Sequence, residues 1–384
     1  MSRPCVMLVA AEPSGDALGA ALAAALLARR DVRLVGVGGP LMARQGVASP
    51  FDIAPLAVLG VFDALAVYPL VRRLARQTGE LAAREKPDVA VLIDSWGFNL
   101  RVAHAIRRAN PAVTLIKYVA PQVWATRPGR ARTLARAVDQ LLTIHAFDAP
   151  WFERAGLATT FVGNPILSRP ELPADPQRLR ATIGATADDP VLVIAPGSRR
   201  REVERLLGPF EDAARLLAAG RPRMKIVVLT AEAVAEAVAE RVKTWPLETH
   251  LSFGESGRRD AMAAATAALA CSGTVTTELA LAGAPVVVAY RVDPPTAVIA
   301  RLLIRTRYAT LMNVAAGWEV APEFIQGACV GPRLAAALAP LLDDPAARAR
   351  QVSDQSAALA IMRGGVDDPA AAAAAAVLAR LPPA

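Results

Sequence analysis

The sequence predicts an α/β protein with two Rossmann-like parallel-sheet domains that face a cleft. Short apolar runs alternate with longer amphipathic segments almost from end to end of the 384-residue chain, which is typical of parallel sheets covered by helices on both faces. The alternation occurs as two series, separated by a proline-rich stretch that begins at Pro165. A chain of this length is also too long for one ordinary core, so we expect two domains of similar size.

Each series supplies strand candidates, which are apolar runs bounded by polar turns. They lie at residues 6–10, 33–37, 89–93, 114–118 and 140–144 in the first series, and at residues 191–195, 225–229, 250–253, 267–271 and 285–289 in the second. We expect the first domain over residues 1–165 and the second over residues 166–365, with the boundary in the proline-rich stretch. The alanine-rich tail, about residues 366–384, is predicted to form a helix that packs back on the first domain.

Composition limits the classes of partner. The 43 Lys and Arg residues against 35 Asp and Glu give a net charge of +8. This favours an anionic partner such as a phosphate, a nucleic acid or an acidic membrane surface, or else reflects a solvated arginine-rich surface. Aromatic residues are only 5% of the chain and have no basic residues interleaved among them, which argues against nucleic acid. A Gly-x-Ser-x-Gly motif is absent from the sequence, so a hydrolase is not favoured.

The cysteines and histidines indicate neither a disulfide framework nor a metal site. The three cysteines are odd in number and far apart, which fits a reducing cytoplasm. His104 and His250 have no clustered partners, and His145 follows a strand of the first domain, where it can face the cleft. We therefore predict no metal and no cofactor. The N-terminal apolar run is too short for a signal peptide or a membrane span, so we expect it to be the first strand.

The first candidate site is the turn after the first strand. It reads AAEPSGDALGA, residues 10–20, and leads into an alanine-rich helical segment. In open α/β sheets, ligands bind beyond the carboxyl ends of the strands. Ser14 or Asp16 can cap the helix, and Gly15 lets a ligand approach the N–H groups of its first turn. For this turn alone, a plain helix cap is favoured over an anion site.

A second candidate in the first domain is Asp94, in the segment VLIDSWGFN. Its position at the end of a strand puts a carboxylate at the edge of the sheet, where it can take a proton from a substrate hydroxyl. The alternative is that Asp94 is the N-cap of a helix that starts near Phe98. The local pattern does not decide between the two.

The second domain has a polar turn in the segment VIAPGSRRREV. Gly197, Ser198 and Arg199 follow a strand and precede a helix. Backbone amides, a hydroxyl and guanidinium groups in this arrangement suit a diphosphate. The segment lacks the lysine of a P-loop, so it is a different kind of phosphate site.

A similar turn follows in the segment ACSGTVTTELALAGAP. Ser272, Gly273 and Thr274 again precede a helix. Glu278 lies one helical turn after Thr274 and on the same face, where it can accept hydrogen bonds from ribose hydroxyls. Together, the two turns of the second domain predict a nucleoside diphosphate site.

Nine motifs resemble, in order, those of the lipid-A-disaccharide synthases, and they cover nearly the whole chain. They are AAEPSGDALGA, GVGGPLMARQG, KPDVAVLIDSWGFNLRVA, KYVAPQVWATRPGR, FVGNP, APGSRRREV, SGTVTTELAL, PVVVAYR and NVAAGWEVAPEFIQ. The resemblance implies a GT-B fold and an inverting glycosyltransferase. Its implied reaction joins UDP-2,3-diacylglucosamine to 2,3-diacylglucosamine 1-phosphate, releasing UDP and forming the β-1,6 disaccharide precursor of lipid A. The implied location is the cytoplasmic side of the inner membrane, as a peripheral protein.

The resemblance also assigns roles to individual residues. Asp94 is the implied general base. The implied UDP contacts are Gly197, Ser198, Arg199, Ser272, Gly273, Thr274, Glu278, Asn313 and Glu319. By analogy with other GT-B enzymes, the opening turn binds the acceptor sugar or its phosphate through Glu12, Ser14, Gly15 and Asp16.

The chain departs from the family pattern at four positions. Gly97 replaces a carboxylate that is usual three residues after Asp94, and Asn164 replaces the histidine of a VGHP motif. Thr126 and Trp318 are also atypical. Because Asn164 cannot titrate, no acid role is expected at that position.

Two other functions stay open on the sequence alone. One is another GT-B enzyme that acts on UDP-sugars, such as a 2-epimerase or an N-acetylglucosaminyltransferase. The other is a paralogue that binds UDP-sugar or membrane without turnover. Whether the chain forms a homo-oligomer is open as well.

One segment of the first domain, residues 56–77, is predicted to contact the membrane. It reads LAVLGVFDALAVYPLVRRLARQ and has too many apolar residues for one buried stripe, with arginines directly after them. Pro69 is expected to break it into a short helix, a turn and a second helix. We expect Val61, Phe62 and Leu65 to form an exposed patch that docks on anionic lipid. The alternative is an ordinary buried helix packed on the sheet.

Overall fold

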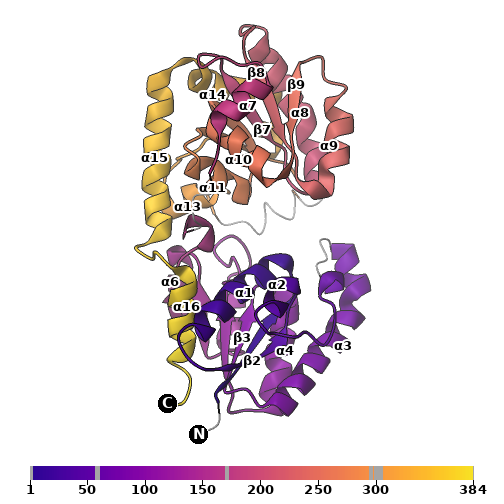
Figure 1. The fold of residues 1–384 in the computed structure, drawn as a ribbon, viewed down its shortest axis with the longest axis vertical. Coiled ribbons are helices and arrows are strands. Elements are labelled where there is room, and N and C mark those ends of the chain that lie inside the picture. Colours follow the sequence, from indigo (N-terminus) through magenta and orange to yellow (C-terminus); the bar gives the residue numbers. More distant parts are fainter. Residues whose placement is uncertain (1–2, 57–60, 169–172, 294–296, 298–305, 384) are drawn as a thin grey trace. The chain divides into compact units, whose positions relative to one another are not determined.

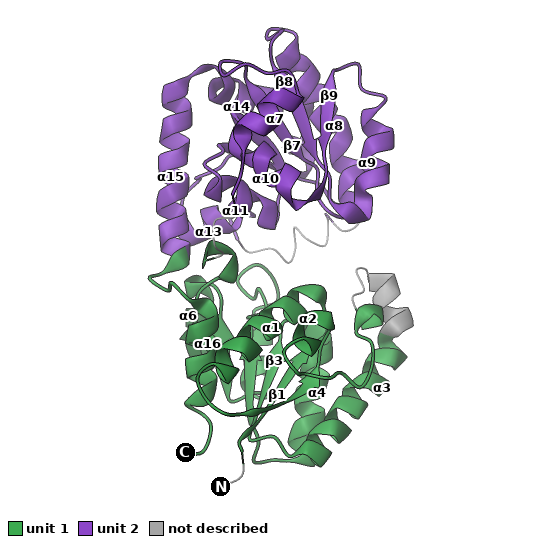
Figure 2. Cartoon of the chain, viewed as in Figure 1, with its two compact units in different colours: residues 1–168, 363–384 green, residues 169–362 purple. Residues whose placement is uncertain are grey.

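The chain divides into two compact units (Figure 2). The computed structural model describes residues 3–56, 61–168, 173–293, 297 and 306–383, and for residues 61–67 it describes the backbone only. Unit 1 comprises Met1–Ser168 and Arg363–Ala384, and unit 2 comprises Arg169–Met362. The chain therefore leaves unit 1 within the proline-rich stretch and returns to it for its last residues.

Unit 1 is built on a six-stranded parallel sheet with strand order β2-β1-β3-β4-β5-β6. The strands are β1 (Cys5–Ala10), β2 (Arg33–Val37), β3 (Val89–Ile93), β4 (Thr114–Tyr118), β5 (Gln140–Thr143) and β6 (Ala158–Phe161). Every residue of β1 and β3 is buried, because helices cover both faces of the sheet, and this accounts for their unbroken apolar runs. The first five strands confirm the sequence prediction to within one residue. The prediction misses β6, a partly exposed edge strand.

The helices of unit 1 form a layer on each face of this sheet (Figure 1). They are α1 (Pro13–Leu27), α2 (Pro40–Ala43), α3 (Val61–Glu85), α4 (Trp96–Ala109), α5 (Gly129–Ala135), α6 (Ala149–Glu153) and α16 (Pro369–Leu378), with the 3₁₀ helices η1 (Ala54–Leu56), η2 (Ala146–Asp148) and η3 (Pro165–Ser168). Helices α3 to α6 contribute to the apolar cluster on one face, and α1, α2 and α16 to the cluster on the other. The C-terminal helix α16 lies against α1.

Helix α3 contains Pro69 and continues through it, so the predicted break at this residue is wrong. A proline inside a helix removes one hydrogen bond and costs about 3 kcal/mol. Packing along α4 offsets this cost. Leu74 and Leu81 are buried in the cluster that α3 shares with α4, and a Cβ at Gly79 would lie 2.8 Å from the Cβ of Ala105.

The predicted apolar patch lies at the start of α3. Val61, Phe62 and Leu65 belong to this helix, but their side chains lie outside the described residues, so their exposure stays a prediction. Tyr68, one turn further on, is 42% exposed. Within the described ranges, no helix is long and apolar enough to cross a bilayer.

Unit 2 is built on a second six-stranded parallel sheet, with strand order β12-β11-β10-β7-β8-β9. The strands are β7 (Val191–Ala195), β8 (Lys225–Leu229), β9 (Thr249–Ser252), β10 (Ala267–Cys271), β11 (Val286–Tyr290) and β12 (Glu323–Ile325). The five longer strands confirm the prediction to within one residue. The prediction misses β12, because three residues at the edge of a sheet give no recognisable apolar run.

Helices also cover both faces of the second sheet (Figure 1). They are α7 (Pro176–Thr182), α8 (Arg200–Ala218), α9 (Ala235–Val242), α10 (Gly254–Ala264), α11 (Thr274–Leu281), α13 (Leu311–Ala316), α14 (Gly331–Asp343) and α15 (Pro345–Arg363), with the 3₁₀ helices η4 (Glu232–Val234) and η5 (Gln326–Ala328). Helices α8, α9 and α14 share one apolar cluster with the sheet. Helix α10 contacts β7, β8 and β9 and adds nothing to that cluster, so it covers the other face.

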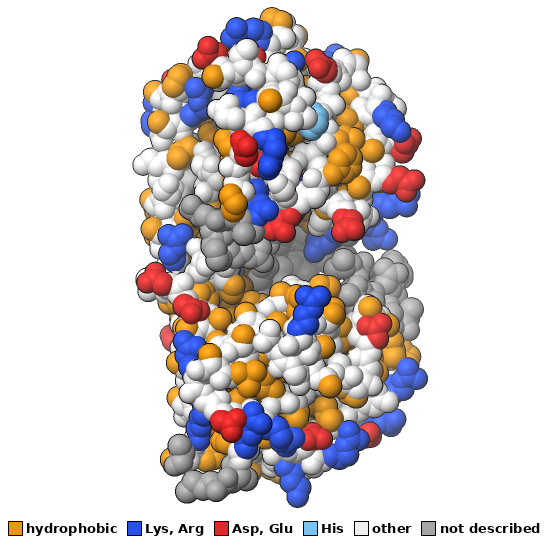
Figure 3. Space-filling model, in the orientation of Figure 1, with side chains coloured by type: hydrophobic (Ala, Val, Ile, Leu, Met, Phe, Trp, Pro, Cys, Tyr) orange, Lys and Arg blue, Asp and Glu red, His pale blue; other side chains and the backbone are white. Residues whose placement is uncertain are grey.

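Charged side chains are spread over the surfaces of both units. On the face shown in Figure 3, Lys and Arg side chains are interspersed with Asp and Glu. The positive net charge therefore does not form one continuous basic patch on this face.

Candidate active site

In unit 1, Asp94 and the opening turn meet at the point where the strand order reverses. Strand β2 lies on one side of β1 and β3 on the other, and Ala10 pairs with Ile93 at the carboxyl ends of β1 and β3. Such a switch point is where open α/β sheets bind ligands. The Ser14 hydroxyl donates to Oδ2 of Asp94 over 2.8 Å. The structure thus joins the predicted base to the predicted acceptor turn.

The backbone at Asp94 is strained. Asp94 and Ser95 have φ angles of 52° and 36°, in the left-handed region that costs non-glycine residues about 1 kcal/mol or more. The Asn99 amide donates to the carbonyls of Ile93 and Asp94 over 2.7 and 2.9 Å. Helix α4 has Ser95 as its N-cap, without a side-chain cap bond. The alternative role of Asp94 as an N-cap is therefore wrong. Asn99 stabilises the turn that sets the position of the Asp94 carboxylate.

Lys117 also stabilises the turn at Asp94, and the sequence analysis did not identify this residue. It is only 3% exposed, and its Nζ donates to the carbonyl oxygens of Asp94 and Tyr118 over 2.6 and 2.9 Å. Burial lowers the pKa of Lys117 to about 8, against the opposing effect of the Asp94 and Glu12 charges. A lysine within the apolar strand TLIKY is the signal that could have found it.

The opening turn is used differently from the prediction. Helix α1 has Glu12 as its N-cap, with no side-chain cap bond, so neither Ser14 nor Asp16 caps it. Asp16 is 3% exposed and accepts hydrogen bonds from the backbone N–H groups of Gly39, Leu41 and Met42 over 2.8 to 3.0 Å. Its carboxylate therefore caps α2 and is not available to an acceptor.

Gly15 brings α1 close to Asp94. A Cβ at this position would lie 3.3 Å from the Cβ of Ala10 and 3.7 Å from the Cβ of Asp94. The first of these separations is tighter than ordinary van der Waals contact. Glycine thus allows the helix start to lie directly against the strand ends.

Unit 2 has its own switch point, between β7 and β10. The two strands pair with Ala195 beside Ala270 at their carboxyl ends, so the turns that follow them lie at the same edge of the sheet. Gly197 has a φ of 111°, and a Cβ there would lie 2.6 Å from Oε2 of Glu202. Ser198, Arg199, Gly273 and Thr274 are exposed, and Ser272 is half-buried. The predicted diphosphate residues are therefore brought together and are open to a ligand.

Two ion pairs border this edge. Arg199 Nη1 lies 3.1 Å from Oε1 of Glu202, and Arg258 Nη2 lies 3.1 Å from Oε2 of Glu278. The side chains of Arg258 and Glu278 are 33% and 30% exposed. Arg258, from α10, is a second cation that the sequence analysis did not assign to the site.

Asn313 lies in α13 and Glu319 follows that helix. Asn313 is fully buried, and its amide accepts from the N–H groups of Val320 and Ala321 and donates to Ala321 O and to Oε1 of Glu323. These four bonds use the whole hydrogen-bonding capacity of the side chain. Asn313 therefore holds this segment together and has no side-chain bond left for UDP. Glu319 is exposed.

Unit 1 also contains a group of polar and aromatic residues, mostly buried, from the segments after β4 and after β5. The indole of Trp124 donates to Oδ1 of Asp148 over 2.9 Å, and His145 stacks on Phe147 with ring centroids 4.9 Å apart. Burial raises the pKa of Asp148 to about 7, although the Trp124 bond opposes this shift. Burial lowers the pKa of His145 to about 4. Asn164, where the family has histidine, is buried and accepts from the N–H of Ile166.

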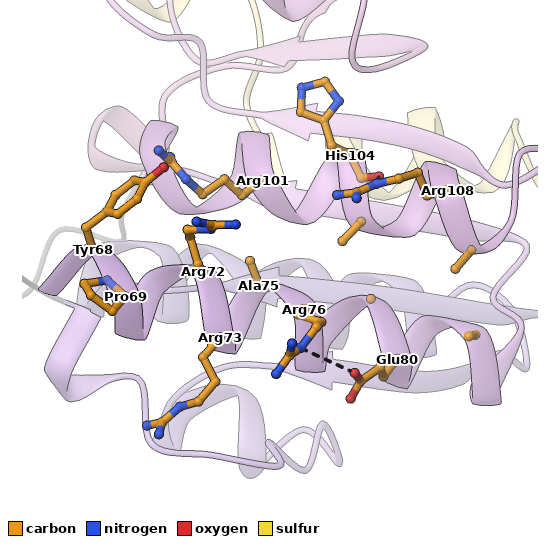
Figure 4. Close-up of a pocket in the computed structure, with 14 residues that line it drawn as sticks. Tyr68, Pro69, Arg72, Arg73, Ala75, Arg76, Glu80, Arg101, His104 and Arg108 are labelled. Carbon is orange, nitrogen blue, oxygen red and sulfur yellow. Dashed lines mark hydrogen bonds and ion pairs between the residues drawn. The ribbon is translucent and has the colours of Figure 1, made fainter.

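A basic furrow runs along α3 and α4 (Figure 4). It has a volume of about 1100 Å³, and small residues line its floor. The arginines that line it are Arg72, Arg73, Arg76, Arg101 and Arg108. At one end the guanidinium of Arg101 lies 4.9 Å from the ring centroid of Tyr68, and its hydrogen bond lowers the pKa of the Tyr68 phenol. Glu80, the acid in the furrow lining, lies 3.7 Å from Arg76.

Metal ligands are not grouped in the described part of the chain. Among those residues, no three His, Cys, Asp or Glu side chains are placed to hold one ion. Cys5, Cys271 and Cys329 are buried free thiols.

The two units, each with a six-stranded parallel sheet between helices, have the GT-B fold of α/β proteins. A putative UDP-N-acetylglucosamine 2-epimerase from Listeria monocytogenes has this fold, with a TM-score of 0.64 and 14% identity over 96% of this chain and 94% of its own. The glycotransferase of kitacinnamycin has a TM-score of 0.64 and 18% identity, over 99% of this chain and 100% of its own. At these identities the likeness shows the fold alone.

Sequence comparison gives the family. The family model of lipid-A-disaccharide synthetase matches residues 6–377. Proteins called lipid-A-disaccharide synthase are similar to this chain in Rhodospirillum centenum, with 43% identity over 90% of the chain and 87% of the relative, and in Paramagnetospirillum magneticum, with 40% identity over 97% and 96%. The chain belongs to the lipid-A-disaccharide synthetase family. It is a UDP-sugar glycosyltransferase of lipid A biosynthesis, and the alternatives left open by the sequence are not favoured.

Proposed function

We propose that the protein joins UDP-2,3-diacylglucosamine to 2,3-diacylglucosamine 1-phosphate, forming the β-1,6 disaccharide and UDP with inversion at the anomeric carbon. The observation that carries this proposal is the Ser14–Asp94 contact at the switch point of unit 1, in a chain of this family. It joins a carboxylate in the motif proposed to supply the base to the turn proposed to bind the acceptor. Small polar turns at the switch point of unit 2 supply the donor side.

In this mechanism Asp94 is the general base. The 6-hydroxyl of the acceptor attacks the anomeric carbon of the donor and gives its proton to the Asp94 carboxylate as the new C–O bond forms. Ser14 binds Oδ2, which orients the carboxylate. Lys117 and Asn99 hold the carbonyl of Asp94, so the base does not have to reorganise during the reaction.

The leaving group departs as UDP, and unit 2 stabilises its charge. The bond between the anomeric carbon and the diphosphate oxygen breaks, and the electron pair goes to that oxygen. We assign the diphosphate to Gly197, Ser198 and Arg199, and to the turn formed by Ser272, Gly273 and Thr274, where N–H groups, hydroxyls and a guanidinium are exposed. We assign the ribose to Glu278. Glu319 remains a proposed contact, whereas the bonds of Asn313 support a structural role.

The proposal is tested with the purified protein and both diacylated sugars. We expect UDP and one disaccharide, detected by mass spectrometry, with a β-linkage identified by the proton coupling at the new anomeric position. Omission of either sugar is the control. Release of UDP without a disaccharide would indicate hydrolysis or epimerisation and would overturn the proposed reaction.

We also propose that unit 1 binds peripherally to the cytoplasmic surface of the inner membrane. Both proposed substrates carry acyl chains, and the furrow along α3 and α4 has five arginines and a single acid among its lining residues. Each arginine near an anionic surface contributes about 1 kcal/mol. The furrow is lined by the later turns of α3, the helix whose first turns contain Val61, Phe62 and Leu65. We propose these three residues as the apolar contact with the membrane.

Vesicle binding separates the two parts of this membrane proposal. Arg72→Gln with Arg108→Gln should weaken binding to phosphatidylglycerol vesicles by roughly 10- to 30-fold. Arg29→Gln with Arg44→Gln, in the exposed turns that follow α1 and α2 on the opposite face, should not. The combined changes Val61→Ser, Phe62→Ser and Leu65→Ser should raise the apparent KM for the lipid acceptor with little change in Tm. A collapse of Tm would show that these three side chains belong to the core. Equal binding by both arginine pairs would overturn the role of the furrow.

A further inference from the structure

The acceptor carries a phosphate, but the turn assigned to the acceptor is acidic. Asp94 borders it, Asp16 lies within it, and the ammonium of Lys117 is buried against two carbonyl oxygens. A phosphate placed there would meet carboxylates of its own sign. The cations that bind it must come from another part of the acceptor side.

The loop between β4 and α5 lies on the other side of Asp94. The strand order puts β3 between β1 and β4, so Asp94, at the end of β3, lies between the opening turn and residues 119–128. The N–H of Asp94 donates to Tyr118 O over 2.9 Å, which joins Asp94 directly to the start of this loop. A sugar whose hydroxyl reaches Asp94 can therefore extend towards the loop.

The loop is held firmly in place. Its start is tied to β5, where the N–H of Val119 donates to Leu142 O over 2.9 Å. Its centre is anchored by Trp124, which is 9% exposed, donates to Asp148 and packs edge-on against Phe147 with centroids 5.4 Å apart. These contacts fix the backbone from which the next residues project.

Two arginines follow this anchor. The N–H of Arg130 donates to Arg127 O over 3.0 Å, so one turn brings the two residues together. The guanidinium of Arg130 lies 5.2 Å from the ring centroid of Trp96, and Trp96 is the first residue of α4, two positions after Asp94. Burial and the charge of Arg127 lower the pKa of Arg130. In the ranges that the structure describes, neither arginine forms an ion pair with a carboxylate.

We infer that Arg127 and Arg130 form the subsite for the phosphate monoester of the acceptor, an inference that rests on the proposed function. Two adjacent guanidinium groups without a carboxylate repel one another until an anion lies between them, and their planar forks bind phosphate oxygens in pairs. The ring of Trp96 contacts the Arg130 guanidinium and links it to the Asp94 turn. The reacting hydroxyl, on C6, and the phosphate, on C1, are carried by the two carbons that flank the oxygen of one sugar ring. The phosphate therefore lies within the reach of one sugar from Asp94, and Trp96 links Arg130 to the Asp94 turn.

The test compares two acceptors, one with and one without the anomeric phosphate. For Arg130→Gln and for Arg127→Gln, kcat/KM for the phosphorylated acceptor should fall by about 10- to 100-fold, because charge-assisted hydrogen bonds are lost. The value for the dephosphorylated acceptor should stay within about twofold of the parent. Where that acceptor reacts too slowly, competitive inhibition by glucosamine 1-phosphate, relative to glucosamine, gives the same comparison.

Three controls make the outcome decisive. Arg132→Gln, an exposed arginine on α5, should leave both acceptors unaffected. UDP affinity, measured by calorimetry, should be unchanged in all variants. If loss of the Trp96 contact destabilises Arg130→Gln, the Arg127→Gln variant alone decides the outcome, because Arg127 is exposed. Equal losses for both acceptors overturn the inference, as does a selective loss in Arg72→Gln, which would place the phosphate in the furrow. A parent protein that forms no disaccharide would instead overturn the proposed function.

Discussion

The two switch points occupy corresponding positions in two similar sheets, but their chemistry differs. In unit 1, Asp94 has a left-handed backbone conformation, its carbonyl accepts a hydrogen bond from the buried Lys117, and its carboxylate accepts one from the Ser14 hydroxyl. In unit 2 the corresponding turns consist of small residues that are mostly exposed, around Gly197 and Gly273. A base has to be held in one orientation, which requires buried partners. A diphosphate is bound by N–H groups, which requires small residues and an open edge.

This difference predicts that damage to unit 1 lowers turnover while damage to unit 2 lowers UDP affinity. The largest effect is expected for Asp94→Asn, which keeps the shape but removes the base, so kcat should fall by roughly 10² to 10⁴. UDP affinity, measured by calorimetry, should change little. Asp88→Asn, at the amino end of the same strand region, is the matched control. Turnover near the parental value in Asp94→Asn would remove Asp94 from the mechanism.

The next largest effects are expected in unit 2. Arg199→Ala and Glu278→Ala should each weaken UDP binding by about 1.5 to 3 kcal/mol, where a charge-assisted hydrogen bond is lost. Calorimetry with UDP alone measures this without lipid. Arg200→Ala removes a neighbouring, more exposed arginine that pairs with Glu204, and it should bind like the parent. If Arg199→Ala and Glu278→Ala also bind UDP as tightly as the parent, the nucleotide site lies elsewhere.

Two glycines sharpen the comparison with smaller changes. Gly15→Ala adds a Cβ 3.3 Å from that of Ala10 and close to Asp94, so kcat should fall a few-fold with UDP affinity unchanged; overpacking of this kind costs roughly 1–3 kcal/mol. Gly197→Ala strains a φ of 111° and approaches Glu202, so UDP affinity should fall about tenfold. Gly220→Ala, with open space around its Cβ position, is the control. Effects on the opposite parameters would contradict the division of roles.

Much of the fold could be predicted because most of its strands are buried on both faces. Such strands are unbroken apolar runs. Eight of the predicted strands have this pattern, and the other two, β2 and β9, are edge strands that were predicted although they are only partly buried. The edge strands β6 and β12 are short and partly exposed, and they were missed. The continuation of α3 through Pro69 could not be predicted, because its stability comes from packing on α4, which local propensity does not contain.

The site was predicted less completely for a different reason. Sequence position indicates that a polar residue follows a strand, but not which groups it will bind. Asp16 and Asn313 lie in the expected motifs, yet their hydrogen bonds go to backbone N–H groups and to a neighbouring carboxylate. Lys117 lies within a strand and not after it, so a search of strand ends overlooks it. Arg258 comes from α10, outside the predicted motif that contains its partner Glu278.

The smallest expected effect in the parent concerns stability, in the part of unit 1 that anchors the β4–α5 loop, because two groups with opposite pKa shifts lie there. Asp148 has a pKa of about 7 in the folded state, above the ordinary 3.8. The folded protein therefore keeps a proton that the unfolded chain loses, and stability falls as pH rises from about 4 to about 7. His145 has a pKa of about 4, below the ordinary 6.5. Here the unfolded chain binds the proton, and stability rises with pH from about 4 to 6.5.

The two contributions oppose one another, so single variants should separate them. In Asp148→Asn, which keeps an acceptor for the Trp124 indole, the free energy of unfolding should rise with pH by roughly 2 kcal/mol between pH 4 and 6.5, relative to the parent. In His145→Gln it should fall by a similar amount over the same interval. Urea unfolding at a series of pH values measures both, and Asp52→Asn, at an exposed turn, is the control for a change of one carboxylate. Parallel pH curves for the parent and both variants would mean that these groups titrate alike in the folded and unfolded chains, and that burial does not control the charge of this part of unit 1.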